Sequence, residues 1–288
     1  MKKFNVLFTA LLCASVMFVG CSDDDDNENG GNGEGAGNGG SGVIVKPKKV
    51  VKMIETSTWE DGGNTGSSKD TTLYAYDAEG RLSKITKLSG DLSNREDVSN
   101  ITYASDKIII TDVPNSSTDV STPSIIELKD GRAIKTTSNG TDYSREVAYS
   151  YSGKYISEMI SKQTEIYDGQ EHIYMDTMIY SVKDGNLVNY IYSDKDDDDI
   201  STMEMSSVDN NMNIDLVYGD IAEIGDGATL LCVTGDRFKK LPAKEIYKEV
   251  GDEDDIITYA YEQDKDGYVT KITMIDGGST NVYEITYE

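Results

Sequence analysis

The dipeptide Asp-Gly recurs along this chain, and its copies lie between short stretches rich in Tyr, Ile, Val and Thr. Both central residues of the tight turn that joins two antiparallel strands need a positive φ, which Gly adopts freely and Asp tolerates. With no long helical period in the same region, the pattern predicts a chain built of hairpins. The copies are Asp61, Asp130, Asp168, Asp184, Asp226, Asp266 and Asp276, with Glu79-Gly80 and Asn139-Gly140 in the same role.

Several of these turns share a longer unit of strand, tight turn and strand. Leu73–Ile85 sets the pattern, Ile257–Ile272 repeats it, and Ile125–Ile134 and Met178–Leu187 are degenerate copies. A recurring unit of this kind favours an antiparallel meander, here of about a dozen to fifteen strands. Because a sheet of this size with open edges would aggregate, we predict an all-β fold that closes, or nearly closes, into a water-soluble barrel.

The segment from Asp215 to Lys240 does not follow this pattern. It has few β-branched residues and contains the apolar run Leu230–Val233 just before Leu241-Pro242. We expect an irregular excursion around residues 215–240, with a short helix as an alternative, that packs over one end of the sheet. It would serve either as a plug or lid with a functional role or as a hydrophobic cap on an open sheet end.

The N-terminus has the character of an export signal. Met1–Lys3 is basic and Phe4–Val19 is mostly apolar, which is typical of a secretory signal peptide and too short for a spanning helix. The end of this run, Phe18–Cys21, resembles the lipobox, in which the Cys is diacylated and becomes the new N-terminus. We therefore predict a signal peptide over residues 1–20 and lipidation at Cys21, which would anchor the protein to a membrane.

Residues 21–42 are predicted to be an acidic, Gly/Asn-rich tether. The run Ser22–Asp26 resembles the signal that sends some Gram-negative lipoproteins to the outer face of the outer membrane, and the alternative is a linker that is merely solvated. The chain then divides into the signal peptide, this tether and a single β domain over residues 43–288. We expect a monomeric outer-membrane lipoprotein that faces the cell exterior.

Charge and residue counts exclude several kinds of function. The chain has 27 Lys and Arg against 52 Asp and Glu, a net charge of −25, which repels nucleic acids. His172 is the single His, so paired-His zinc sites are excluded, and with no G-x-S-x-G motif we interpret it as an ordinary surface residue. Cys232 lies in an apolar run and is interpreted as a buried, inert thiol without a disulfide partner.

Clusters of acidic residues are candidate Ca²⁺-binding sites, because Ca²⁺ prefers oxygen ligands. Asp194–Asp199 and Asp252–Asp255 are such clusters, and Glu262–Gly267 mimics the start of an EF-hand loop. Position twelve of that loop would be Thr273 instead of Glu. We interpret all three segments as solvated hairpin loops, and we predict neither a metal site nor a cofactor.

Three segments together resemble a known family. They are Tyr74–Leu82 (Tyr-x-Tyr-Asp-x-x-Gly-Arg-Leu), Asp266–Ile272 and Gly235–Pro242. In this combination the chain, over roughly Lys48 to Glu288, resembles an uncharacterised family of bacterial lipoproteins, a domain of unknown function described as having a porin-like fold. The resemblance implies a large antiparallel barrel and no chemistry. The strand faces carry Lys, Glu, Thr and Ser, whereas a lipid-facing barrel needs an apolar outer band. We therefore expect the barrel to be water-soluble and not to span a membrane.

No catalytic or ligand-binding residue stands out. Glycoside hydrolysis needs two carboxylates at a fixed separation, and the many acids of this chain neither support nor exclude it. Trp59 and the tyrosines could stack on sugars, although Tyr in strands usually reflects cross-strand packing. We expect a non-enzymatic, surface-tethered binding module for a glycan, an apolar small molecule or a protein. The alternatives are a structural or assembly lipoprotein of an envelope complex and a carboxylate-dependent glycoside hydrolase.

Overall fold

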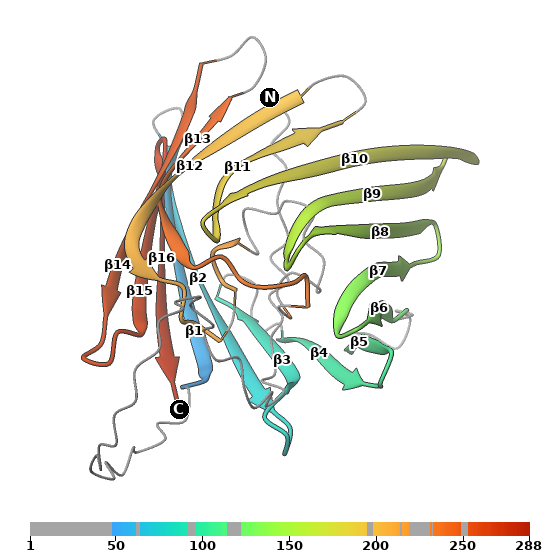
Figure 1. Cartoon of the computed structure of the whole chain (residues 1–288), viewed down its shortest axis with the longest axis horizontal. Helices are drawn as coiled ribbons and strands as arrows, with labels where there is room; N and C mark the ends of the chain where they lie inside the picture. The colour runs from blue at the N-terminus through green and yellow to red at the C-terminus, as the bar shows by residue number, and fades with distance from the viewer. Residues whose placement is uncertain are drawn as a thin grey trace, which may run out of the picture.

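The computed structural model describes residues 48–61, 64–90, 96–113, 122–194, 198–213, 215–218, 231, 233–248 and 253–288. These residues form sixteen antiparallel strands in chain order, and the last strand pairs with the first to close a barrel (Figure 1). The predicted all-β antiparallel meander is therefore confirmed. It closes with one strand more than the largest number that the turns suggested.

The strands of the first half are β1 (Val50–Asp61), β2 (Asn64–Tyr76), β3 (Leu82–Ser89), β4 (Glu96–Tyr103), β5 (Lys107–Val113), β6 (Ser124–Lys129), β7 (Arg132–Asn139) and β8 (Tyr143–Ser152). Those of the second half are β9 (Tyr155–Tyr167), β10 (Gln170–Lys183), β11 (Asn186–Ser193), β12 (Asp198–Asp209), β13 (Lys240–Lys248), β14 (Asp255–Gln263), β15 (Val269–Asp276) and β16 (Ser279–Tyr287). Because consecutive strands run in opposite directions, their connections alternate between the two ends of the barrel.

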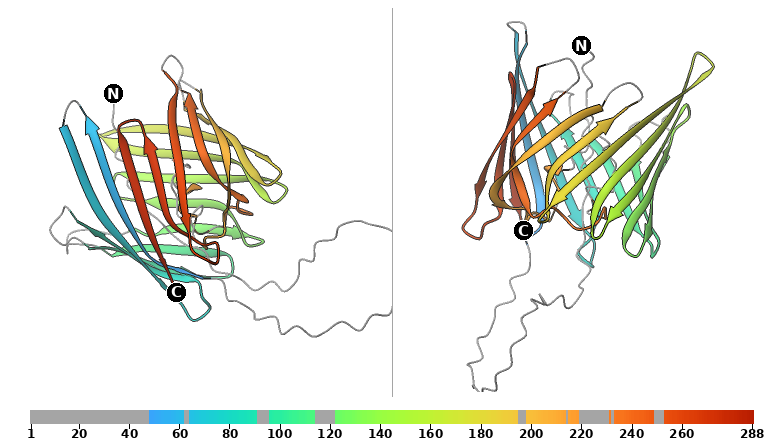
Figure 2. Two further views of the ribbon diagram at one scale, coloured as in Figure 1. Left: turned by 90° about the vertical axis from the view of Figure 1, so that its left-hand side faces the viewer. Right: turned by 45° about the horizontal axis from the view of Figure 1, so that its top comes forward.

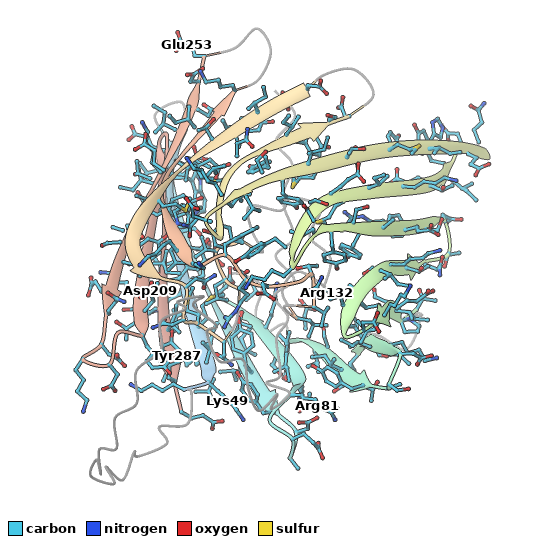
Figure 3. All side chains as sticks on the ribbon, viewed as in Figure 1. Lys49, Arg81, Arg132, Asp209, Glu253 and Tyr287 are labelled. Atoms are coloured by element: carbon cyan, nitrogen blue, oxygen red, sulfur yellow. The ribbon has the colours of Figure 1, made fainter. Side chains whose placement is uncertain are left out.

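We call these ends the turn end and the loop end. The turn end holds the connections that follow the even-numbered strands, together with the backbone pairing of Lys49 with Glu288 (N···O distances of 3.2 and 2.9 Å). The loop end holds the connections that follow the odd-numbered strands. In Figure 3, Lys49, Arg81 and Tyr287 mark the turn end, whereas Glu253 marks the loop end.

The four repeated sequence units form the hairpins β2–β3, β6–β7, β10–β11 and β14–β15, so the unit recurs every fourth strand with its turn at the turn end. Asp130-Gly131, Asp168-Gly169 and Asp184-Gly185 have positive φ at both residues, as a type I′ turn requires. In the wider turns at Gly80 and Gly267 only the Gly is left-handed, and Asn139-Gly140 joins its strands without positive φ. The Asp226 copy lies outside the described residues.

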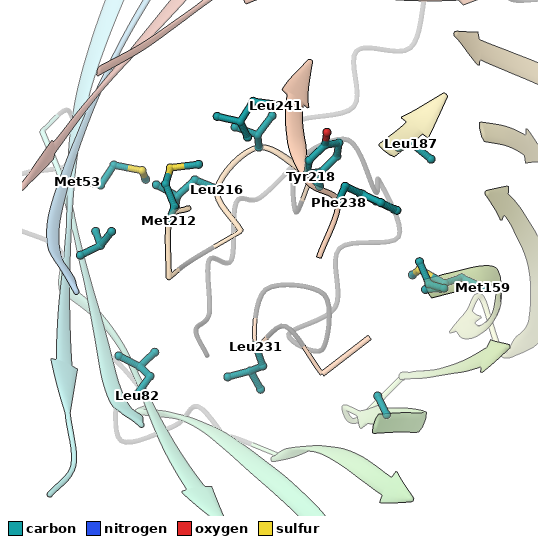
Figure 4. Close-up of a cluster of buried hydrophobic side chains, with 14 of the residues drawn as sticks. Met53, Leu82, Met159, Leu187, Met212, Leu216, Tyr218, Leu231, Phe238 and Leu241 are labelled. Atoms are coloured by element: carbon teal, nitrogen blue, oxygen red, sulfur yellow. The ribbon is translucent and has the colours of Figure 1, made fainter. Parts of the chain in front are cut away.

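The described residues between β12 and β13 lie inside the turn end. They are 210–213, 215–218, 231 and 233–239, and they belong to no strand, as predicted for 215–240. Because the sheet is closed, these residues do not cap an open edge: they pack inside the turn end of the barrel, and we call them the plug. Figure 4 shows its buried apolar side chains surrounded by those of the wall. The labelled plug residues are Met212, Leu216, Tyr218, Leu231 and Phe238, and the labelled wall residues are Met53, Leu82, Met159, Leu187 and Leu241.

Backbone hydrogen bonds tie the plug to separate turns of the wall. The Ala133 amide donates to Val233 (2.8 Å), the Asp236 amide to Lys154 (2.7 Å) and the Lys239 amide to Gly185 (2.9 Å). These contacts join the starts of β7, β9 and β11 to one segment. The plug therefore supplies the core that a wide barrel cannot fill from its wall alone.

Tyrosine hydroxyls close the turn end in a repeated way. Each of four tyrosines within the last three residues of an even-numbered strand donates to a backbone carbonyl within the first three residues of the preceding strand: Tyr76, Tyr151, Tyr261 and Tyr287. The phenol–carbonyl distances are 2.5–2.7 Å. Burial raises the pKa of Tyr151 to about 12, although Arg132 lowers it. A Phe could fill the same space but not satisfy the carbonyl, which accounts for the preference for Tyr.

The signal peptide, Cys21, the tether and Cys232 lie outside the described residues, so those predictions stay untested. Among the residues that are described, no helix has the length and apolar character needed to cross a membrane.

Candidate functional site

The inner wall changes character along the barrel axis. On β1, every second side chain faces inward, and Met53, Glu55, Ser57 and Trp59 follow one another from the turn end toward the loop end. Met53 is buried, Glu55 and Ser57 are half-buried, and Trp59 is 42% exposed. Solvent therefore reaches the inner wall in the loop-end half of the barrel.

Most charged side chains on this part of the inner wall are acidic. The strand registers place Lys87 and Arg145 on it as cations. The carboxylates on the same face, which we call the acidic wall, are Glu55, Asp70, Asp97, Asp112, Glu165, Asp176, Asp199, Glu245, Asp255 and Asp276. Such a concave surface repels anions and favours neutral or cationic ligands.

Glu245 on β13 is the most buried of these carboxylates, at 2% exposure. Its Oε1 accepts hydrogen bonds from the hydroxyls of Tyr190 (2.5 Å) and Ser201 (2.7 Å), and its Oε2 accepts one from Tyr259 (3.3 Å). These hydroxyls take the place of water around the carboxylate, which allows its burial. The sequence analysis did not identify this group. The one sequence feature that points to it is the spacing of Glu245 and Tyr247, which are two residues apart and therefore lie on the same face of a strand.

Two further carboxylates on the acidic wall pair with tyrosines. Tyr247 donates to Asp199, and Tyr192 donates to Asp176 (3.2 Å). Burial raises the pKa of Asp176, Asp194 adds to the rise, and the Tyr192 hydroxyl opposes it. Asp199 was expected in a solvated loop with its acidic neighbours, but β12 carries it onto the inner wall.

A second carboxylate group lies across β1 and β2. Glu55 stands opposite Asp70 on one side and Tyr283 on the other. Burial raises the pKa of Glu55, and the negative charge of Asp70 raises it further, whereas Lys87, Ser57 and Tyr283 lower it. Glu55 is thus a partly desolvated carboxylate with a like charge beside it.

Trp59 lies nearer the loop end, opposite Gly66 of β2 and Ser279 of β16. A Cβ on Gly66 would lie only 2.3 Å from the indole Cζ2 and 2.4 Å from Cε2. The ring therefore occupies the space left by the missing side chain. The structure thus places Trp59, the single Trp of the chain, at the rim of the loop end, which we call the mouth.

The β9–β10 hairpin reaches beyond its neighbours at the loop end, across the mouth from the β1–β2 hairpin (Figure 2, right). His172 stacks on Tyr167 with ring centroids 3.6 Å apart, and Tyr174 lies beside them. Ile173 and Met175 on the outer face are more than half exposed. His172 is thus a strand residue near the surface, as interpreted from the sequence, within an aromatic cluster that the sequence did not reveal.

The EF-hand-like segment is a hairpin turn at the turn end. Its carboxylates are engaged by lysines: Lys48 binds Asp264 (2.6 Å) and Asp266 (2.7 Å), and Lys271 binds Glu262 (2.8 Å). Asp264 also accepts the amides of Asp266 and Tyr268 in its own turn. Within the described part of the chain, no three His, Cys, Asp or Glu side chains form a group that could hold a metal ion.

The outer wall carries ion pairs between neighbouring strands. Lys135 pairs with Glu146 (2.5 Å), and Lys244 with Glu204 (3.7 Å). These charges share the outer face with threonines and with single exposed residues such as Ile134. Charged side chains thus lie on the face that a lipid bilayer would have to cover.

Comparison with known proteins identifies the fold. No protein-family model and no curated protein matches the chain. A porin-like protein from Bacteroides uniformis matches with a TM-score of 0.61 and 21% identity over 82% of this chain and 97% of its own. A porin-like protein from Bacteroides vulgatus matches with a TM-score of 0.55 and 14% identity over 83% and 99%. The chain therefore shares the fold of these porin-like proteins, in the form of a closed barrel of sixteen antiparallel strands.

Proposed function

We propose that the protein is a non-enzymatic binding module whose ligand enters through the loop end. The ligand would be a glycan, an apolar small molecule or a protein. The observation that supports this proposal is the contrast along the inner wall: apolar and filled by the plug at the turn end, but polar, acidic and solvent-accessible toward the loop end. A concave surface with convergent polar groups above a rigid core is typical of a binding site.

In this proposal, Cys21 is lipidated and residues 21–42 tether the barrel to the outer face of the outer membrane. The described chain enters the barrel at the turn end, where Lys49 pairs with Glu288. The tether would therefore join the turn end, and the loop end would point away from the membrane. The ion pairs on the outer wall support a barrel that stands in water.

Mass spectrometry of the mature protein tests the anchor. We expect a diacylated or triacylated Cys as the first residue, and we expect Cys21→Ser to release the protein from the membrane fraction. An unmodified thiol at that position would contradict the anchor without affecting the binding proposal.

We assign no catalytic step to the acidic wall. Both carboxylate oxygens of Glu245 are occupied by hydroxyls of its own barrel, and tyrosines also bind Asp199 and Asp176. These contacts give the carboxylates a structural role as hydrogen-bond acceptors between strands. The proposal therefore assigns ligand binding to the acidic wall and no catalysis.

A thermal-shift screen of the mature protein tests the binding module. Neutral and charged oligosaccharides, fatty acids and envelope protein extracts are the probes, and a ligand should raise the Tm by mass action. Asp276→Asn, on the inner wall beside Ser279, should reduce that shift, whereas Glu146→Gln, on the outer wall, should leave it unchanged. No shift with any probe would overturn the proposal.

A structural or assembly role is the second candidate, and the β9–β10 hairpin favours it. Ile166, Ile173 and Met175 are each at least half exposed on its projecting outer face, as expected for a surface that meets another protein. A photo-crosslinking residue at Ile173 should then capture one partner in stoichiometric yield, and the same residue at Lys244 should not. Equal labelling at both positions would count against this role.

A further inference from the structure

We propose that Trp59 and Gly66 form a subsite for one pyranose ring of a neutral glycan at the mouth of the barrel. The inference rests on the proposed binding function and narrows its ligand to one class. Three features of the β1–β2 hairpin support it: the way the indole is held, the hydrogen-bonding groups near it and the charge beneath it.

The indole of Trp59 is held where a ligand can reach it. It is 42% exposed, and it occupies the space that any side chain at position 66 would need. Its neighbours across the strands are small, Gly66 on β2 and Ser279 on β16. A ring that is fixed before binding loses little conformational entropy when a second ring stacks on it.

Hydrogen-bonding side chains lie one step deeper than this ring on the same face of the sheet. Ser57 stands opposite Ser68 on β2 and opposite Asn281 on β16, and all three are half-buried. Glu55 follows Ser57 one step further into the barrel. A pyranose needs both parts of this arrangement, because its C–H face packs on an aromatic ring while its hydroxyls donate and accept at the edge.

The charge beneath the ring selects against acidic sugars. Glu55 lies opposite Asp70, and burial together with that neighbouring charge raises the pKa of Glu55. A uronate or sulfate would add a further negative charge to this pair. Sugar hydroxyls would instead donate hydrogen bonds to carboxylates that burial has partly stripped of water.

The experiment uses the fluorescence of Trp59, which is the single Trp of the chain and therefore reports on this site alone. The probes are maltohexaose, cellohexaose, laminarihexaose, xylohexaose and mannohexaose, with hexagalacturonate as the anionic and spermine as the cationic comparison. We expect a saturable change in emission with at least one neutral hexasaccharide and none with hexagalacturonate. Silence across the neutral probes, equal binding of hexagalacturonate, or a response to spermine alone would each overturn the inference.

Variants then test the two residues, with affinity measured by calorimetry because Trp59→Ala removes the fluorophore. Trp59→Ala should weaken binding at least tenfold, Trp59→Tyr should weaken it less, and Gly66→Ala should weaken it by displacing the ring. Ser67→Ala is the matched control, since Ser67 is on the same strand with its side chain on the opposite face. Circular dichroism checks that each variant folds.

The outcomes separate this inference from the proposed function. If a ligand found in the thermal-shift screen binds Trp59→Ala and Gly66→Ala as tightly as the original chain, the subsite is wrong and the binding module stands. If no glycan, lipid or protein binds the mature chain at all, both proposals fail.

Discussion

The turn end and the loop end are built from the same sixteen strands, yet their inner walls have opposite chemistry. Buried aliphatic side chains, tyrosine–carbonyl hydrogen bonds and the plug gather at the turn end. Carboxylates and exposed aromatic rings gather toward the loop end, as Glu55 and Trp59 illustrate on β1. This barrel therefore confines its apolar core to one end of its axis and keeps polar, solvent-exposed side chains at the other. One end forms the core, which leaves the other end free to remain polar.

The largest effect should come from emptying the plug. Phe238 is 7% exposed, and its ring lies edge-on to that of Tyr218 at 4.8 Å between centroids. We expect Phe238→Ala to lower the free energy of unfolding by about 3–5 kcal/mol, measured by urea denaturation. Tyr174→Ala, at the exposed loop end, should cost less than about 1 kcal/mol. Similar losses for the two variants would remove the distinction between the ends.

The plug should also make stability depend on pH. Asp215 is 5% exposed, and burial raises its pKa from 3.8 to about 6, although Arg237 and the amides of Tyr218 and Val217 lower it. Because the folded chain holds this proton more tightly than the unfolded chain, stability falls as the pH rises from about 4 to about 6. It remains lower at higher pH.

Asp215→Asn removes this titration while keeping an acceptor for the Tyr218 amide. The substitution should stabilise the protein at pH 7.5 by up to about 3 kcal/mol and have little effect near pH 3. Asp236→Asn, at an exposed plug residue, is the control. Destabilisation of Asp215→Asn at pH 7.5 would mean that the attraction to Arg237 outweighs the cost of burial.

A third pair of variants compares the inner wall with the outer wall. Glu245→Gln places an amide among the hydroxyls of Tyr190, Ser201 and Tyr259, so at least one hydrogen bond is lost in a buried site. We expect a loss of about 2 kcal/mol in the free energy of unfolding. Glu146→Gln breaks a solvent-exposed pair with Lys135 and should cost about 0.5 kcal/mol. The reverse order would show that the buried network is not stabilising.

The smallest expected effect is the difference in stability between Gly→Ala variants of two turns of the same type. Gly169 and Gly185 both have positive φ, at +71° and +83°. A Cβ at Gly185 would lie 2.7 Å from the Tyr155 hydroxyl and from Lys239 Cε, whereas a Cβ at Gly169 meets nothing within 4 Å. Both Ala variants should lose about 1 kcal/mol to backbone strain. Gly185→Ala should lose about 1 kcal/mol more because its neighbours must move, and thermal unfolding of the two variants measures the difference.

The sequence predicted the strands better than the site. Asp130-Gly131 and Asp184-Gly185 specify their turns locally through positive φ, so the hairpins could be read from dipeptides. Glu245 could not be found in this way. It is one of 52 acidic residues, and its burial depends on hydroxyls from three other strands, 14, 44 and 55 residues away in sequence. The irregular segment at 215–240 was recognisable in the sequence. Its place inside the barrel depends on the closure of the sheet, which no local sequence pattern encodes.

Local sequence patterns specify an all-β chain of antiparallel hairpins, because turn chemistry and the alternation of side chains act between near neighbours. Three features become visible only in the folded barrel: β16 pairs with β1, the plug packs inside the turn end, and Trp59 packs against Gly66 at the mouth. Those features depend on the number of strands in the ring and on their register. Both are properties of the whole sheet, and they are fixed only when β16 pairs with β1.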